Sequence, residues 1–188
     1  MTNNDNDTLT HSEEMQNNIE PIIHTKEENI LIGSDHRGFD LKVLLREHLI
    51  KAQYNDLYDV GTHDKDRCDY PSIAQALVGT LLTDSRNKKG ILICGSGFGM
   101  SITANRNKGI HAVVPRSVEE CKIARQHGNV NVLCIGSDFT TNDVAIQIVN
   151  TFLNTPFEEL STSRYSQRIQ MIDYDIMKDI SKMTPVDN

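Results

Sequence analysis

A cysteine followed by a glycine-rich segment is the part of this sequence whose residue types best suit chemistry. Cys94 comes directly after the apolar run at residues 91–93, and residues 95–99 read GSGFG. Glycines let the backbone approach a ligand closely, and the helix predicted from residue 100 offers free N–H groups that favour anions. The positive end of such a helix also favours the thiolate form of a nearby cysteine. These residues predict a site for an anionic or oxyanion-bearing ligand, with a reactive sulfur at its edge.

Single positions exclude several other loops of this composition. The dinucleotide-binding pattern G-x-G-x-x-G would need glycine at position 100, which is Met100. A cysteine phosphatase loop would need arginine at the same position, and the sequence contains no Walker pattern. On these residues alone, Cys94 could also be a small apolar side chain buried in the core. The residues at the ends of the other strands have to distinguish this role from a catalytic one.

A second polar segment follows another apolar run. Residues 29–33 (NILIG) predict a strand, and Asp35 and His36 come directly after it. Ligands bind at the carboxyl ends of parallel strands, so both side chains are expected at the same edge as Cys94. The alternatives are that Asp35 caps the next helix and that His36 is an exposed loop residue.

Two arginines near the end of the sequence are spaced four residues apart. Arg164 and Arg168 belong to a predicted helix that also carries Ile169, Ile172 and Ile176. At this spacing both guanidinium groups can lie on one helical face and hold a phosphate. The alternative is a pair of solvated arginines.

Apolar runs and amphipathic stretches alternate along the chain. Strands are predicted at residues 29–33, 57–60, 91–93, 110–114 and 132–135. In chain order, helices are predicted from residue 39, over 71–82, from residue 100, over 117–125 and around 144–152. His127, Gly128 and Asn129 are expected to end the helix that begins at residue 117. This alternation predicts a parallel sheet that is covered by helices on both faces.

Composition limits the class of protein. The 188 residues suit one domain with a tail: we expect a disordered polar extension at 1–28, a domain at 29–180 and a flexible tail at 181–188. A net charge of -7 argues against nucleic-acid or anionic-membrane partners, and no apolar stretch approaches the roughly 20 residues of a membrane span. The four cysteines form no C-x-x-C pair, which argues against zinc and predicts reduced thiols in a cytoplasmic protein.

Five motifs in collinear order closely resemble those of the type B ribose-5-phosphate isomerases, a family that includes allose- and galactose-6-phosphate isomerases. They are GSDHRGF (33–39), DYP (69–71), GILICGSGFGMSITANR (90–106), RQHGNVNVL (125–133) and R-x-x-x-R (164–168). The resemblance covers about residues 29–172. The resemblance implies an α/β fold, a Rossmann-like three-layer α/β/α sandwich with a five-stranded parallel sheet. It also implies a homodimer or dimer of dimers whose active sites are shared between subunits.

The activity that the resemblance implies is interconversion of D-ribose 5-phosphate and D-ribulose 5-phosphate in the pentose phosphate pathway, without a metal or organic cofactor. By resemblance, Cys94 is the base that moves a proton between C2 and C1 through a cis-enediolate, and His127 opens the sugar ring. The positions implied to bind substrate are Asp35, His36, Tyr70, Gly95, Ser96, Gly97, Phe98, Gly99, Ser101, Gly128, Arg164 and Arg168.

Each implied binding position has a role in the family pattern. The residues from Gly95 to Gly99 hold the enediolate oxygens, Ser101 helps to fix the loop and helix start, and Tyr70 lines the pocket. Asp35 holds sugar hydroxyls. His36 and an arginine pair from the partner subunit, Arg164 and Arg168, bind the phosphate. A second subgroup carries glutamate at the place of Met100 and lacks the cysteine, so this chain resembles the cysteine-base group.

Two departures from the family pattern bear on the substrate. Gly128 stands where the family usually has asparagine, and the segment before Arg164 is two residues longer than usual. Alternatives to the pentose phosphate isomerase are therefore an isomerase of allose or galactose 6-phosphate and a non-catalytic sugar-phosphate binder. A nucleotide-binding Rossmann module is a more distant alternative.

Overall fold

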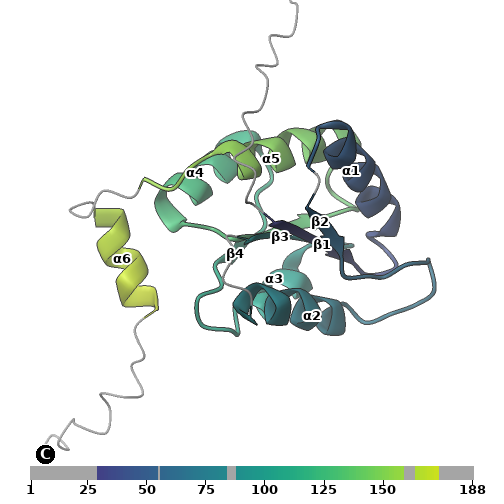
Figure 1. Ribbon diagram of the computed structural model, residues 1–188, viewed down its shortest axis with the longest axis horizontal. Coiled ribbons are helices and arrows are strands. Elements are labelled where there is room, and N and C mark those ends of the chain that lie inside the picture. Colours follow the sequence, from purple (N-terminus) through teal and green to yellow (C-terminus); the bar gives the residue numbers. More distant parts are fainter. Residues whose placement is uncertain (1–28, 55, 84–87, 159–163, 174–188) are drawn as a thin grey trace, which may run out of the picture.

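The computed structural model describes residues 29–54, 56–83, 88–158 and 164–173 (Figure 1). The predicted polar extension at 1–28 and the predicted tail at 181–188 lie outside these ranges. Among the described residues, no helix has both the length and the apolar character needed to cross a membrane.

One parallel sheet forms the centre of the molecule, with its strands in the order β2-β1-β3-β5-β4. The strands are β1 (Asn29–Ser34), β2 (Leu57–Asp59), β3 (Lys88–Cys94), β4 (Ala112–Val113) and β5 (Val132–Gly136). The prediction of a five-stranded parallel sheet is therefore confirmed. The central strand β3 pairs with β1 on one side and β5 on the other, which places Cys94 in the middle of the sheet edge.

Helices cover both faces of this sheet, which confirms the three-layer arrangement (Figure 1). The helices α1 (Phe39–Lys51), α4 (Val118–Gly128) and α5 (Asn142–Asn154) pack on one face. The helices α2 (Tyr70–Thr83) and α3 (Phe98–Ala104) pack on the other. Parallel strands covered on both sides are apolar along their length, as β1, β3 and β5 are here.

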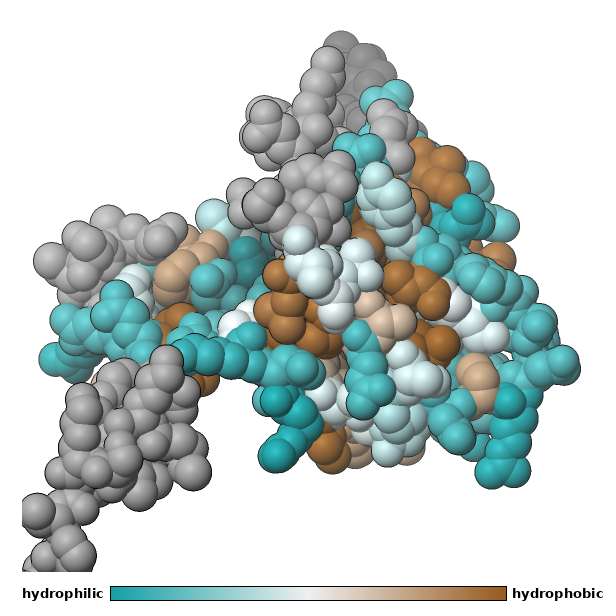
Figure 2. Space-filling view, turned by 60° about the horizontal axis from the view of Figure 1, so that its bottom comes forward, coloured by the Kyte–Doolittle hydropathy of each residue, from teal (hydrophilic) through white to brown (hydrophobic). Residues whose placement is uncertain are grey.

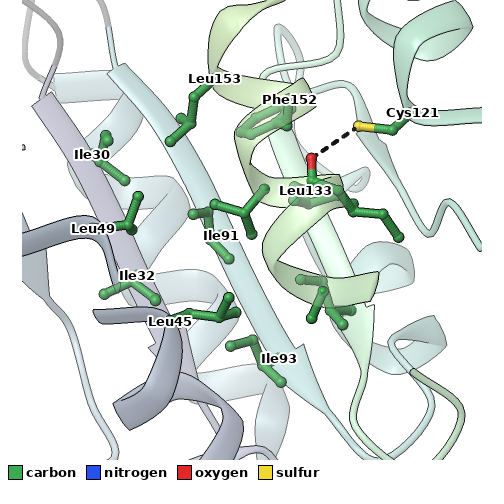
Figure 3. Close-up of a cluster of buried hydrophobic side chains, with 14 of the residues drawn as sticks. Ile30, Ile32, Leu45, Leu49, Ile91, Ile93, Cys121, Leu133, Phe152 and Leu153 are labelled. Carbon is green, nitrogen blue, oxygen red and sulfur yellow. Dashed lines mark hydrogen bonds between the residues drawn. The ribbon is translucent and has the colours of Figure 1, made fainter. Parts of the chain in front are cut away.

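Alternation along β3 divides its side chains between two apolar cores. Ile91 and Ile93 belong to the core under α1 and α5, part of which Figure 3 draws, while Leu92 and Cys94 belong to the core under α2 and α3. Successive strand residues point to opposite faces, so this division follows from the sequence position alone. The sulfur of Cys94 therefore lies on the α2–α3 side of the sheet.

One predicted strand is shorter than expected, whereas the predicted end of the following helix is confirmed. The strand predicted at residues 110–114 is only Ala112–Val113, because Ile110 N–H closes a turn onto the Asn107 carbonyl. The helix predicted to end at His127, Gly128 and Asn129 does end there: its last residue is Gly128, and Asn129, at φ 44°, adopts the left-handed conformation that terminates it. His127 therefore lies in the last helical turn of α4. At the other end of α4, Ser117 is the N-cap, and its Oγ accepts the Glu120 N–H at 3.2 Å.

The last described helix, α6 (Arg164–Ile172), lies outside the three layers, beside the end of α4 (Figure 1). None of its residues is buried. Because α4 begins after the carboxyl end of β4 and returns along the sheet, its last turn and α6 lie at the sheet edge opposite to Cys94.

Candidate active site

Cys94 ends the central strand with its side chain turned into the glycine loop. The residue is 4% exposed, and its Sγ accepts a hydrogen bond from the Gly97 N–H at 3.1 Å. Gly97 adopts the left-handed region at φ 78°, which brings this N–H back toward the sulfur and begins α3. A directed N–H donor is the contact that a thiolate acceptor requires. Cys94 is therefore both a buried core residue and a sulfur with a hydrogen-bond donor suited to a thiolate.

Tyr70 lies against the glycine loop. The N-terminus of α2 carries this side chain over Gly99, where an added Cβ would be 2.6 Å from the Tyr70 ring. Only glycine leaves room for that ring at position 99. Tyr70 itself remains 39% exposed, so one part of it faces the open side of the loop.

The polar groups of the loop are already connected to one another. Ser96 Oγ accepts the Phe98 N–H at 3.4 Å, and the Gly97 N–H is directed at Cys94. A ligand oxygen would have to replace these contacts to use the two N–H groups. Ser101 lies one turn further along α3 and donates its hydroxyl to the Ala112 carbonyl at 3.2 Å. Ser101 therefore holds α3 against β4.

Asp35 is brought next to the end of β3. It is 4% exposed, and its N–H donates to the carbonyl of Ile93 at 3.1 Å. Its Oδ1 accepts the N–H groups of Arg37 and Gly38 at 2.9 and 3.0 Å. The carboxylate thus shapes the β1–α1 loop, although the helix N-cap itself is Gly38. Loop shaping and substrate contact are compatible, because both accepted bonds go to one oxygen.

His36 is half-buried and fixed by a second loop, so it is not the exposed loop residue of the alternative reading. Its Nδ1 lies 3.1 Å from the Cys68 carbonyl oxygen and 3.4 Å from the Cys68 N–H nitrogen. With Nδ1 engaged by the backbone, Nε2 is the nitrogen through which His36 can meet a ligand.

Sequence reasoning missed an ion pair that crosses the glycine loop. Arg37 Nη2 contacts Asp138 Oδ2, which joins the β1–α1 loop to the β5–α5 loop. A Cβ added to Gly95 would be 2.5 Å from Arg37 Nε and 2.8 Å from Asp138 Oδ2. The side chains of this ion pair therefore pack against the backbone of Gly95 and occupy the space that a side chain at this position would need. The available signal was that both residues follow strands whose carboxyl ends share one sheet edge.

A buried lysine is a further feature that sequence reasoning missed. Lys42 is 1% exposed, and its Nζ donates to both carboxylate oxygens of Asp59, at 2.7 and 2.8 Å, and to the Thr62 carbonyl. These contacts fix the start of the loop at residues 60–69. The same loop supplies the Cys68 backbone to His36 and leads into Tyr70.

A second group of predicted residues gathers at the end of α4. The His127 ring stacks on Tyr165 of α6, with ring centroids 3.9 Å apart and planes inclined by 6°. Arg164 and Arg168 are exposed on the same helix. At Gly128 an added Cβ would meet only Val130 Cγ2, at an ordinary 3.5 Å. His127 and the arginine pair therefore belong to one neighbourhood.

The predicted site residues thus fall into two groups within one chain. Asp35, His36, Tyr70 and the Cys94 loop share the carboxyl edge of the sheet. His127 and α6 lie at the far end of α4, whose 11 residues span roughly 16 Å. The first group has a base, a carboxylate, an imidazole and backbone donors, and the second has an imidazole and two guanidinium groups.

Comparison with known proteins gives consistent results over most of the chain. The family model of the Ribose/Galactose Isomerase family matches residues 30–172. A probable ribose-5-phosphate isomerase B of Mycoplasma genitalium is 41% identical over 145 residues, 77% of this chain and 93% of its own length. The ribose-5-phosphate isomerase B of Escherichia coli is 37% identical over 143 residues, 76% of this chain and 93% of its own length.

Solved structures of the same kind are similar in fold. The ribose-5-phosphate isomerase B of Mycoplasma genitalium with bound ribulose-5-phosphate has a TM-score of 0.72 at 38% identity, covering 84% of this chain and 98% of that one. The Clostridium thermocellum ribose-5-phosphate isomerase B has a TM-score of 0.74 at 34% identity, covering 81% and 99%. With its cysteine loop, its parallel sheet and these matches, the chain belongs to the Ribose/Galactose Isomerase family.

Proposed function

We propose that this chain is an aldose–ketose isomerase that interconverts D-ribose 5-phosphate and D-ribulose 5-phosphate. The observation that carries the proposal is the placement of Cys94, at the end of the central strand with the Gly97 N–H directed at its sulfur. The relatives named as ribose-5-phosphate isomerases and the neighbour with bound ribulose-5-phosphate support the choice of a pentose phosphate.

The proposed reaction moves one proton between neighbouring carbons. The Cys94 thiolate takes the C2 proton of the open-chain aldose, and the electrons of the broken C–H bond form the C1–C2 double bond of a cis-enediolate. The thiol then returns the proton to C1, while the hydroxyl proton on O2 passes to O1 and leaves a carbonyl at C2. N–H groups of the glycine loop stabilise the negative enediolate oxygen.

Two copies of the chain together build each site in this proposal. His127 and the arginine pair lie at the sheet edge opposite to Cys94, so a second copy has to bring them to it. Apolar side chains gather on the face where α2 and α3 lie (Figure 2). Phe98, in the glycine loop where α3 begins, and Ile102, one turn later, are 61% and 67% exposed. Exposed apolar patches of this kind suit a protein partner, here a homodimer or a dimer of dimers.

The free thiols suit a reducing compartment. All four cysteines are unpaired, and disulfides are rare in the cytoplasm. We therefore place the reaction in the cytoplasm.

Isomerisation of a hexose 6-phosphate is the second candidate function. The observation that favours it is Gly128, which carries no side chain next to His127, at a position where an added Cβ would meet only Val130 Cγ2, at 3.5 Å. The chemistry at Cys94 would be the same. Comparison of kcat/KM for ribose 5-phosphate and allose 6-phosphate separates the two, and a large preference for the hexose would replace the first proposal.

Substitution of the sulfur tests the chemistry itself. We expect Cys94→Ser to lower kcat for ribose 5-phosphate by at least about a thousandfold, while calorimetric binding of the sugar phosphate stays within about threefold, because the base acts in the transition state. Cys68→Ser is the matched control, since Cys68 contributes backbone contacts rather than its sulfur. Full activity of Cys94→Ser would contradict the proposed role.

A further inference from the structure

The contacts that hold α6 to the rest of the chain involve two histidines. Tyr165 stacks on His127, and Asp173, directly after the helix, has its Oδ1 3.3 Å from His111 Nε2. No side chain of α6 is buried. Because α6 has no buried face, these side-chain contacts contribute directly to its position.

The stack on His127 is nearly parallel and close. A centroid distance of 3.9 Å at 6° is face-to-face contact between the imidazole and the phenol ring. Such contact restricts rotation of the imidazole plane. It uses only the faces of the ring, so the in-plane directions of both ring nitrogens stay open to proton transfer.

Ring opening needs an imidazole in a defined orientation. His127 takes the proton of the anomeric hydroxyl, and the electron pair of that O–H bond forms the C1 carbonyl. The C1–O4 bond breaks, its electrons go to O4, and the imidazolium returns the proton to O4. One imidazole therefore serves two oxygens, and a small misplacement affects both transfers.

We propose that Tyr165 is a positioning residue for His127, and that α6 links phosphate binding to ring opening. This inference rests on the proposed function. Arg164 and Tyr165 are consecutive in α6, so a phosphate bound by the arginine pair also holds the tyrosine ring against the imidazole. Binding energy from the phosphate, which is remote from the reacting carbon, is then used to orient the acid–base group.

Two substrates separate ring opening from proton transfer. Ribose 5-phosphate is cyclic and must be opened, whereas ribulose 5-phosphate is acyclic, because its 5-hydroxyl carries the phosphate. Exchange of a C1 proton of ribulose 5-phosphate with D2O, followed by NMR, therefore reports proton abstraction at Cys94 without ring opening. Turnover of ribose 5-phosphate reports both steps.

The test compares three variants in the full chain. We expect Tyr165→Leu to lower kcat for ribose 5-phosphate by about tenfold or more, with C1 exchange of ribulose 5-phosphate kept within about threefold. Tyr165→Phe keeps the stack and should retain both activities. Tyr58→Leu removes a tyrosine that is 46% exposed on the edge strand β2, and it should leave both activities unchanged.

Unchanged turnover in Tyr165→Leu would overturn the inference, and so would an equal loss of turnover and exchange in a protein with an unchanged circular dichroism spectrum. Loss of turnover in Tyr165→Phe as severe as in Tyr165→Leu would also overturn it, because the ring face would not be the cause. An unmodified protein without any C1 exchange would contradict the proposed function, and this inference with it.

Discussion

The sulfur of Cys94 differs from those of the two other buried cysteines in what surrounds it. Cys121 donates its S–H to the Ile148 carbonyl at 3.5 Å within the core drawn in Figure 3. Burial raises the pKa of the Cys121 thiol to about 12, although Arg125 opposes the shift. Burial also raises the pKa of Cys134 far above its usual range. Cys94 instead has an N–H group directed at its sulfur and an adjoining loop of glycines.

This contrast predicts selective alkylation. A raised pKa keeps Cys121 and Cys134 as unreactive thiols at every pH well below about 12, so iodoacetamide at pH 8 should leave both unmodified. We expect Cys94 to be carboxamidomethylated, with loss of isomerase activity, and ribose 5-phosphate to protect both the residue and the activity. Peptide mass spectrometry at several times measures the extent at each cysteine. Labelling of Cys121 at the rate of Cys94 would contradict this prediction.

At the scale of elements, the loop at residues 60–69 depends on one buried charge. The strand before it, β2, has only three residues, and Lys42 holds the junction through Asp59 and the Thr62 carbonyl. This loop in turn fixes His36 through the Cys68 backbone. A buried ion pair thus connects α1 to the phosphate side of the proposed site.

Removal of that lysine should affect both stability and substrate binding. We expect Lys42→Met to lower the free energy of unfolding by about 3 kcal/mol, because Asp59 would lose its partner in a largely buried place. KM for ribose 5-phosphate should rise, since the support of His36 loosens. Urea denaturation and steady-state kinetics measure the two effects.

An exposed pair of the same residue types gives the control. Lys65 contacts Asp40 at 2.7 Å, but the two side chains are 65% and 78% exposed. Lys65→Met should change the free energy of unfolding by no more than about 0.5 kcal/mol and leave KM unchanged. Equal effects of the two substitutions would mean that burial of Lys42 does not matter.

The elements that the sequence predicted well are those with local signals. The apolar runs at 29–33, 91–93 and 132–135 became the three central strands, and the residues that follow the first two share one edge as expected. Arg37–Asp138 could not be predicted as a pair, because its members are 101 residues apart and meet only through the strand order. Lys42 lies in an amphipathic helix pattern, in which a lysine reads as a solvated residue.

Contacts between distant segments were also not predictable in the second group of site residues, which comprises His127, Arg164 and Arg168. Arg164 and Arg168 follow from helical spacing, and their helix is confirmed as α6. The stack of Tyr165 on His127 depends on how α6 returns to α4, which no local pattern specifies. The catalytic and binding roles that the family motifs imply for individual site residues stay predictions.

At the scale of the whole molecule, the separation of the two groups by the length of α4 makes a strong prediction about mixed dimers. If one copy supplies Cys94 and its partner supplies His127, then Cys94→Ala and His127→Ala damage opposite halves of each site. A mixed dimer of the two variants keeps one intact site, built from the undamaged half of each copy. The other site of the same dimer carries both substitutions.

Each variant alone should therefore be nearly inactive, while dimers reassembled from an equal mixture should regain about a quarter of the unmodified activity, since half of the dimers are mixed and each has one working site. Activity assays after separation and reassociation of the chains measure the recovery, and a doubly substituted chain mixed with either variant is the control that should not recover. An equal mixture that stays inactive after verified exchange would mean that one copy supplies both residues. In that case His127 would have to reach Cys94 within its own chain, which the course of α4 opposes.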